Sequence, residues 1–211
     1  MTDRSAAGEP KRKQYASRMA PEQRREQLLD VALAIAATRG LREVNMESIA
    51  RESGVTKPVV YGVFANAEAV LEALVEREQR RAQRHLQDAV TSDLDLSDPV
   101  RALSIGVAGF LSAVRANPAT WRLLLSAEQL PEAARAQYDR SRQSLLEQLT
   151  LLAEAGLSLR ASGPLDPTLL ARLILVGVEE ATRLVLDDPD TFTEDRLAAF
   201  VSELARLIQE G

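Results

Sequence analysis

The sequence predicts an all-α protein of about nine helices, in which a three-helix helix-turn-helix head precedes a larger helical body. Alanine, leucine, arginine and glutamate are abundant, and aromatic residues make up only 4% of the chain, which favours helices over sheets. Apolar residues recur at helical spacing between prolines and glycines, and no stretch alternates as a strand would. Apolar residues amount to 45% of the chain, enough to fill a sizeable core.

Residues 1–20 combine glycine, proline, serine and charge without an apolar period, which is typical of a flexible arm. The basic side chains of this arm include Arg12, Lys13 and Arg18. Two interpretations remain open: the arm is a solvated tail, or it reaches DNA phosphates or a neighbouring minor groove.

The first helix of the head is expected over residues 21–39. Pro21 suits the first turn of a helix, where a missing backbone donor does no harm, and Gly40 suits the position just past its end. An apolar stripe that runs from Leu28 to Ile35 marks the side that faces the core.

Residues 46–64 predict two short helices joined by a tight turn. Gly54 stands where the first helix must end, because a left-handed cap is least costly for glycine. Thr56 is expected to cap the second helix with its side-chain oxygen. Val60 and Phe64 share one buried face of the second helix, and its outer edge consists of Pro58, Val59, Tyr61 and Gly62. A short helix of this kind suits presentation to a groove.

Charge is distributed unevenly along the chain, although its net value is only −5. Residues 1–64 contain 11 Lys and Arg against 8 Asp and Glu, whereas residues 65–211 contain 15 against 23. The front of the protein therefore tolerates a polyanion that the back repels, which supports a nucleic-acid partner.

A fourth helix is expected after Asn66, a preferred N-cap residue. Its apolar start and its highly charged stretch from Glu76 to Gln87 are typical of a connector between head and body. His85, the only histidine, lies in this charged run and is expected on a solvated face. The body then continues with helices at about 100–115, 119–128, 131–155, 168–186 and 194–209.

The last two of these helices are apolar on most sides, and such helices are buried on most sides. We therefore predict that they pair with the same helices of a second subunit in a four-helix bundle. The alternative is that both belong to the core of a single chain. The predicted dimer interface consists of Leu170, Leu173, Ile174, Gly177, Leu184, Phe200, Val201, Leu204 and Ile208.

From about Arg25 to Leu74 the sequence resembles the tetracycline-repressor (TetR) family of bacterial transcription regulators. The resemblance rests on a first helix that ends in Gly40, on ESIARESGV as the next helix and turn, on TKPVVYGVF as the recognition helix, and on ANAEAVLEALV as the start of the fourth helix. The order and spacing of these motifs are specific, whereas the rest of the chain matches only in length and helix count.

The resemblance implies a ligand-responsive regulator that binds a double-stranded, pseudo-palindromic DNA operator as a homodimer and is released by a small-molecule effector. It favours a repressor and implies three segments: the basic arm of residues 1–20, a DNA-binding head of residues 21–66, and an effector-binding and dimerisation body of residues 67–211. The alternatives are an activator, or a regulator that a protein partner controls instead of a small molecule, and an enzyme is a remote alternative.

The DNA contacts of the family carry over onto matching positions of this chain. Ser48 and Thr56 are expected to contact phosphates, and the Tyr61 hydroxyl is expected to meet the DNA backbone. The residues expected to face base edges are Lys57, Pro58 and Val59.

Two positions depart from the family pattern. Gly62 belongs to the same outer edge but stands where a larger, often basic, residue is common. Ala67 stands where a lysine often touches phosphate. Fewer phosphate contacts predict weaker DNA binding with a shallower salt dependence, unless the basic arm compensates.

The resemblance also implies an effector cavity between the fourth helix and the helices that follow it. The candidate lining residues are Phe110, Val114, Trp121, Leu124, Leu125, Tyr138, Leu145 and Leu149, and the candidate polar anchors are Arg122, Gln129, Arg142, Glu179 and Arg183. The competing interpretation is that the aromatic residues are plain core and that Arg183 forms a surface ion pair with its neighbours on the helix. The lining favours an apolar or amphipathic effector.

No catalytic residue, cofactor or metal site is predicted. The chain contains no cysteine, no GxSxG, no HExxH and no glycine-rich phosphate loop. Asp93, Asp95 and Asp98 lie close together but lack the glycine and closing glutamate of an EF-hand, so a loop or helix cap is favoured. The first twenty residues lack the apolar core of a signal peptide, and no apolar run approaches the ~20 residues that span a bilayer. We therefore expect a cytoplasmic protein without a membrane partner.

Overall fold

The computed structural model describes residues 19–89, 99–158 and 165–210. Within these ranges the chain forms nine α-helices and two short 3-10 helices and contains no strand, which confirms the all-α class. The head consists of α1 (Pro21–Arg39), η1 (Leu41–Glu43), α2 (Met46–Ser53) and α3 (Lys57–Tyr61). The body consists of α4 (Ala67–Ala89), α5 (Pro99–Ala116), α6 (Pro118–Leu125), η2 (Ala127–Gln129), α7 (Glu132–Ser158), α8 (Pro167–Asp187) and α9 (Glu194–Glu210).

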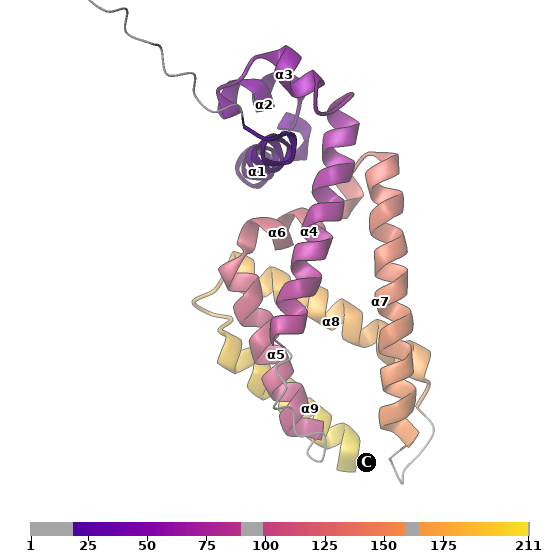
Figure 1. The fold of residues 1–211 in the computed structure, drawn as a ribbon. Helices are drawn as coiled ribbons and strands as arrows, with labels where there is room; N and C mark the ends of the chain where they lie inside the picture. The colour runs from indigo at the N-terminus through magenta and orange to yellow at the C-terminus, as the bar shows by residue number, and fades with distance from the viewer. Residues whose placement is uncertain (1–18, 90–98, 159–164, 211) are drawn as a thin grey trace, which may run out of the picture.

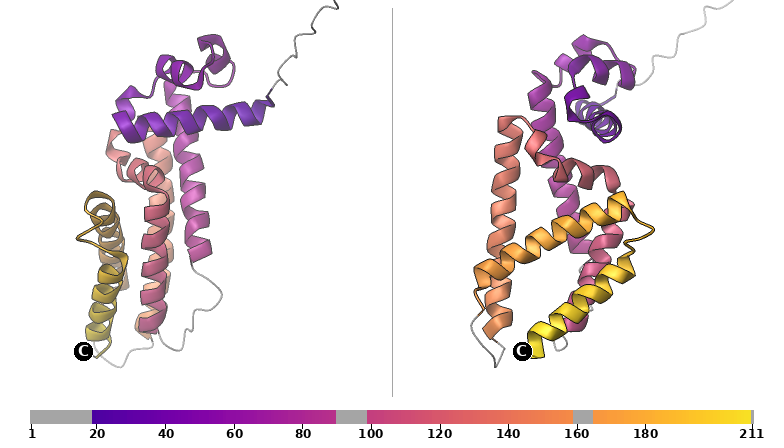
Figure 2. Two further views of the ribbon diagram at one scale, coloured as in Figure 1. Left: turned by 90° about the vertical axis from the view of Figure 1, so that its left-hand side faces the viewer. Right: turned by 180° about the vertical axis from the view of Figure 1, so that it is seen from behind.

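The head forms one end of an elongated molecule, and α4 runs from it into the body (Figure 1). Within the body, α4 packs against α5, α6 and α7, while α8 rests on α7 and α9 rests on α5. Seen from behind, α8 and α9 cross the body on its outer side and diverge from each other (Figure 2). These two helices therefore do not form the tight pair that their sequences suggested.

The core of the head does not stop at the predicted boundary of residue 66. Leu28, Ile49 and Val60 are fully buried, and they share one cluster with Leu74 of α4. The same cluster extends to Ala134 of α7. The head is therefore packed directly onto the body instead of being joined to it by a linker.

Most predicted helix boundaries agree with the structure, but the recognition helix is shorter than expected. It was predicted to run to Phe64, whereas α3 ends at Tyr61. The Val63 amide bonds to the carbonyl of Val60 at 3.0 Å, three residues back, so the chain tightens into a turn after Gly62. Phe64 is nevertheless buried at 3% exposure, so the expected packing face is retained. The acidic positions Asp93, Asp95 and Asp98 lie outside the described residues.

The charged half of α4 departs most clearly from expectation, because part of it is buried between head and body. The side chain of Glu78 is 0% exposed. Its Oε1 accepts hydrogen bonds from Arg77 Nε at 2.8 Å and from Arg81 Nη1 at 3.1 Å. Its Oε2 accepts a hydrogen bond from the Thr120 hydroxyl of α6 at 2.5 Å. Both carboxylate oxygens are thus satisfied by protein groups.

Arg77 extends this cluster to the head. Its side chain is 5% exposed, and its Nη1 donates to Glu26 at 3.1 Å and to Asp30 at 2.8 Å, both on α1. Together with Glu78 and Thr120, Arg77 links α1, α4 and α6 through consecutive charge-assisted hydrogen bonds. We call Arg77, Glu78, Arg81 and Thr120 the junction cluster.

Among the helices of the described ranges, none has the length and apolar character that a membrane span requires.

Removal of one member of a buried ion pair leaves an uncompensated charge and typically costs about 3–5 kcal/mol. Glu78→Ala is therefore expected to lower the free energy of unfolding by about that amount in urea titrations at fixed protein concentration. Glu76→Ala is the matched control, since Glu76 forms an exposed pair with Arg80 on the same helix. The control should change stability by no more than about 0.5 kcal/mol, and equal losses in both variants would contradict a buried, shared charge at position 78.

Candidate nucleic-acid interface

The N-terminus of α2 is held by a reciprocal cap. Asn45 Oδ1 accepts hydrogen bonds from the amides of Glu47 at 3.1 Å and Ser48 at 2.9 Å, while Ser48 Oγ accepts one from the Asn45 amide at 3.2 Å. The Ser48 hydroxyl also donates to the Glu43 carbonyl at 2.6 Å, and the residue is only 3% exposed. The structure therefore does not support the predicted phosphate contact by the Ser48 side chain, because this hydroxyl is already used inside the head.

The turn between α2 and α3 follows the prediction at Gly54, which adopts a left-handed conformation with φ 67°. Thr56 occupies the N-cap position of α3, but its side chain makes no capping hydrogen bond, so the predicted role as a side-chain cap is wrong. Its carbonyl accepts the Val59 amide at 2.9 Å instead. Thr56 is exposed, and its hydroxyl is available to an external ligand.

The two sides of α3 differ as the helical period predicted. Val60 is fully buried in the head core, whereas Tyr61 is 55% exposed and Val59 is 39% exposed. The other exposed members of this edge are Lys57, Pro58 and Gly62. We call this edge, from Lys57 to Gly62 without Val60, the reading edge.

The single charge on the reading edge is compensated by the neighbouring helix. Lys57 Nζ lies 3.0 Å from Glu47 Oε2, and both side chains are more than half exposed. The hydrogen bond and the positive charge of Lys57 hold the pKa of the Glu47 carboxyl below its usual value. The only lysine beyond residue 13 is thus engaged in the protein without DNA.

The rest of the described head is also electrically balanced. Residues 19–66 contain six basic and six acidic side chains, and Glu52 pairs with Arg39 at 3.3 Å. The predicted arm residues Arg12, Lys13 and Arg18 lie outside the described residues. Any positive excess at this end of the chain therefore comes from residues 1–18.

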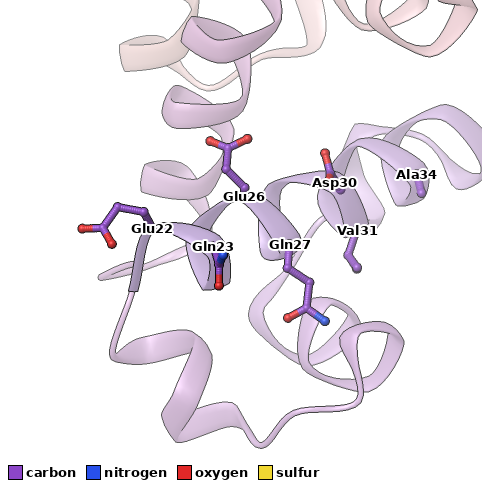
Figure 3. Close-up of a pocket in the computed structure, with 7 residues that line it drawn as sticks. All are labelled: Glu22, Gln23, Glu26, Gln27, Asp30, Val31 and Ala34. Atoms are coloured by element: carbon purple, nitrogen blue, oxygen red, sulfur yellow. The ribbon is translucent and has the colours of Figure 1, made fainter. Parts of the chain in front are cut away.

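The outer side of α1 is acidic and forms a shallow groove. Figure 3 shows Glu22, Glu26 and Asp30 along this helix, and Gln27 and Val31 also line the groove. Since Glu26 and Asp30 already pair with Arg77 of α4, this side of the head serves the junction with the body. Its negative charge makes it unsuited to a polyanion.

The predicted effector residues do not surround one cavity. Phe110 and Trp121 stack edge to face with ring centroids 5.1 Å apart, and Val114 is fully buried beside them. Val185 of α8 belongs to the same cluster. These side chains form a packed core between α5, α6 and α8, in agreement with the competing interpretation for the aromatic residues.

A second group lies along the contact between α7 and α8. Arg142 Nε donates to Glu179 Oε1 at 2.9 Å. Burial, followed by the charge of Glu179, raises the pKa of Tyr138. Leu149 packs in a small cluster at the same contact, whereas Leu145 is 38% exposed. Arg142 and Glu179 thus connect the two helices in this structure.

A third group lines a pocket of about 400 Å³ where the end of α1 meets α6 and α8. The predicted residues on its wall are Arg122, Leu125, Gln129 and Arg183. Arg122 Nη2 donates to the Leu186 carbonyl at 2.6 Å, which ties α6 to the end of α8. We call this space the junction pocket, because its walls come from both head and body.

Some polar side-chain atoms of the body are buried without a hydrogen-bond partner among the described residues. They include Gln79 Oε1, His85 Nδ1 and Trp121 Nε1. The expectation of a solvated His85 is thus wrong for its Nδ1, because α4 packs against α5 and α7 in this region. The charged residues around His85 gave no indication in the sequence that one side of this helix is buried.

The predicted dimer residues are partly exposed in the single chain. Leu173 is 70% exposed, Phe200 is 66% exposed and Leu204 is 46% exposed. Ile174 and Gly177 are also exposed, whereas Leu170, Leu184 and Val201 are half-buried, and the Ile208 side chain lies outside the described residues. Further exposed apolar side chains of the body, outside the predicted interface list, include Ile105, Leu151, Leu152, Leu165, Leu169, Val176 and Leu207.

Comparison with known proteins shows similarity over the head and a shared overall fold. The family described as "Bacterial regulatory proteins, tetR family" matches residues 28–74. The HTH-type transcriptional regulator EthR of Mycolicibacterium smegmatis is 30% identical over 122 residues, which cover 58% of this chain and 55% of EthR. The alignment thus spans little more than half of that relative.

Two solved structures illustrate the shared fold. A TetR-like transcriptional regulator from Rhodococcus sp. RHA1 has a TM-score of 0.74 at 24% identity, over 92% of this chain and 100% of that chain. The structure of AibR in complex with isovaleryl coenzyme A and operator DNA has a TM-score of 0.70 at 21% identity, over 86% of this chain and 97% of that chain.

Asn45 and Thr56, the N-cap residues of α2 and α3, allow a matched test of stability. Asn45→Ala removes the acceptor for two amides of α2 and is expected to lower the free energy of unfolding by about 1 kcal/mol. Thr56→Ala should change it by less than about 0.5 kcal/mol, because the Thr56 hydroxyl caps nothing. Urea unfolding of both variants at one protein concentration measures the difference, and equal losses would contradict the assignment of the caps.

Proposed function

We propose that the chain is a transcriptional repressor of the TetR family of bacterial regulatory proteins, which binds a pseudo-palindromic DNA operator as a homodimer. The match of residues 28–74 to this family supports the proposal, as does the fold shared with a TetR-like regulator. The reading edge carries this proposal: a short helix exposes one edge to solvent while Val60 anchors the opposite edge in the head core.

On this proposal the reading edge enters the major groove. Lys57 donates to guanine O6 and N7 or to a phosphate, and Val59 can contact a thymine methyl group. The hydroxyls of Thr56 and Tyr61 reach phosphates, since both residues are exposed beside the helix. The buried Ser48 takes no part in this interface through its side chain.

The described head supplies little net attraction for DNA, because its six basic side chains are balanced by six acidic ones. Residues 1–18 contain five basic and two acidic side chains. We therefore assign the general attraction for phosphates to this arm, which would reach the backbone or a neighbouring minor groove.

Two copies of the reading edge are needed for an operator with two half-sites about 34–36 Å apart. The exposed apolar residues of α8 and α9 support a dimer in which these helices pair with those of a second copy. Leu169, Leu173 and Val176 follow helical spacing on α8, as do Phe200, Leu204 and Leu207 on α9. A second subunit would bury these exposed side chains.

We further propose that a small apolar or amphipathic effector binds the body and changes the separation of the heads. An effector can do so only if it prefers one arrangement over the other. The junction pocket supports this mechanism, because α1 of the head and α6 and α8 of the body all form its walls. AibR, whose solved structure contains isovaleryl coenzyme A and operator DNA, suggests an acyl compound as one candidate for a first ligand panel.

The reading edge is tested with an operator selected from random duplexes by the parent protein. Lys57→Ala is expected to weaken operator binding about tenfold or more, and Tyr61→Phe about threefold to tenfold through loss of one phosphate hydrogen bond. Fluorescence anisotropy measures the dissociation constants. Tyr138→Phe makes the same chemical change in the body and should bind like the parent. Parental binding by both reading-edge variants would refute the proposed interface.

The dimer is tested by placing one charge on each exposed apolar helix. Leu173→Glu and Phe200→Glu should shift the protein toward monomers in sedimentation-velocity experiments at micromolar concentration, because a pairing surface would have to bury a carboxylate. Ala136→Glu is the control, since it adds the same charge at an exposed apolar position of α7. A parent protein that remains monomeric at this concentration would rule out the α8–α9 interface. If the parent dimerises and both variants dimerise as strongly as the parent, the interface is also ruled out.

A further inference from the structure

Glu47 shares the exposed surface of the head with the reading edge, although no DNA contact is assigned to it above. It occupies the first turn of α2, where its backbone amide donates a hydrogen bond to Asn45 Oδ1 at 3.1 Å. Its side chain is 68% exposed and reaches across to α3, where its carboxylate binds Lys57 at 3.0 Å. A carboxylate therefore stands beside the one cation of a helix that is proposed to face a polyanion.

We infer that Glu47 is a specificity-determining residue, which restrains Lys57 on most DNA sequences and accepts a hydrogen bond from a cytosine amino group in the operator. This inference rests on the proposed function, since it concerns how the reading edge discriminates among duplexes.

The first part of the inference follows from charge. Lys57 must leave Glu47 to reach a phosphate or a base, and the carboxylate then faces the phosphates without its closest cation. The other nearby cation is Arg51, one turn along α2, which also acts on the Glu47 carboxyl. Arg51 is engaged with Glu52 at 3.5 Å. An unrelated duplex therefore gains a contact with Lys57, but its phosphates also repel the Glu47 carboxylate, and this repulsion weakens binding.

The second part follows from the chemistry of the major groove. The cytosine N4 amino group is the donor that a carboxylate accepts there, whereas guanine O6 and N7 are acceptors that suit Lys57. One duplex can thus satisfy both members of the pair if a cytosine amino group lies beside Glu47. The repulsion that Glu47 exerts on all DNA is then offset at that sequence only, and specificity comes from this difference.

The test compares Glu47→Gln with Glu52→Gln, which removes the same charge from the same helix at a residue paired with Arg39. Full-length parent and variants are titrated by fluorescence anisotropy against the selected operator and against an unrelated duplex of equal length, at several salt concentrations. Glu47→Gln is expected to bind the unrelated duplex about threefold to tenfold more tightly, with operator binding unchanged or weaker. The ratio of the two affinities should fall by about threefold to tenfold or more, whereas Glu52→Gln should keep it within about twofold.

Selection from random duplexes provides a second measurement. The parent should enrich a cytosine at one position of each half-site. Glu47→Gln should weaken that preference in favour of adenine, because a glutamine amide can pair with adenine N6 and N7, while the other preferences are retained.

Binding of the parent to duplex DNA tests the proposed function independently of this inference. If the parent binds while Glu47→Gln retains the parental affinity ratio and selects the same sequences, the inference is overturned.

Discussion

The position of the reading edge depends on a carboxylate that lies inside the molecule. Glu78 on α4 accepts hydrogen bonds from Arg77, Arg81 and Thr120, and Arg77 continues to the acidic side of α1. A charge buried in this way is costly unless all its partners are in place, so the cluster favours one arrangement of the three helices. Because α1 carries the core on which α2 and α3 rest, the same arrangement orients the reading edge.

In this architecture, general attraction for DNA and discrimination among DNA sequences would come from different parts of the chain. The described head is electrically balanced, and its reading edge holds one lysine that is already paired. On the proposed function, general affinity for DNA would come from residues 1–18, while α2 and α3 would contribute shape and a few directed contacts. Such a protein would depend strongly on the geometry of its two heads, because little additional charge is available to compensate for a poor fit. An effector that alters the junction between α1, α4 and α6 would then have a large effect on binding.

The sequence predicted the elements of the fold well because local chemistry decides them. Prolines and glycines mark most helix ends, and the alternation of buried Val60 with exposed Tyr61 follows directly from helical period. Prediction from the sequence failed where the role of a side chain depends on a partner far away in the chain. The burial of Glu78 requires Thr120, 42 positions away, and a chain of glutamates and arginines shows no sign of that contact.

The functional residues show the same limit. Ser48 was expected to touch phosphate, but its hydroxyl belongs to the cap that Asn45 forms on α2. The predicted effector residues divide among a packed core of α5, α6 and α8, the contact between α7 and α8, and the junction pocket. Helix crossing depends on side-chain packing between remote segments, so no periodicity along the chain would have separated the three groups.

Hydrogen exchange followed by mass spectrometry tests most directly whether the junction cluster couples the head to the body. In Glu78→Gln, the amides of α1 and α6 should exchange faster than in the parent, while those of α9, which rests on α5, should be unchanged. Unchanged exchange in α1, or an equal increase in every helix, would contradict the coupling of head and body through Glu78.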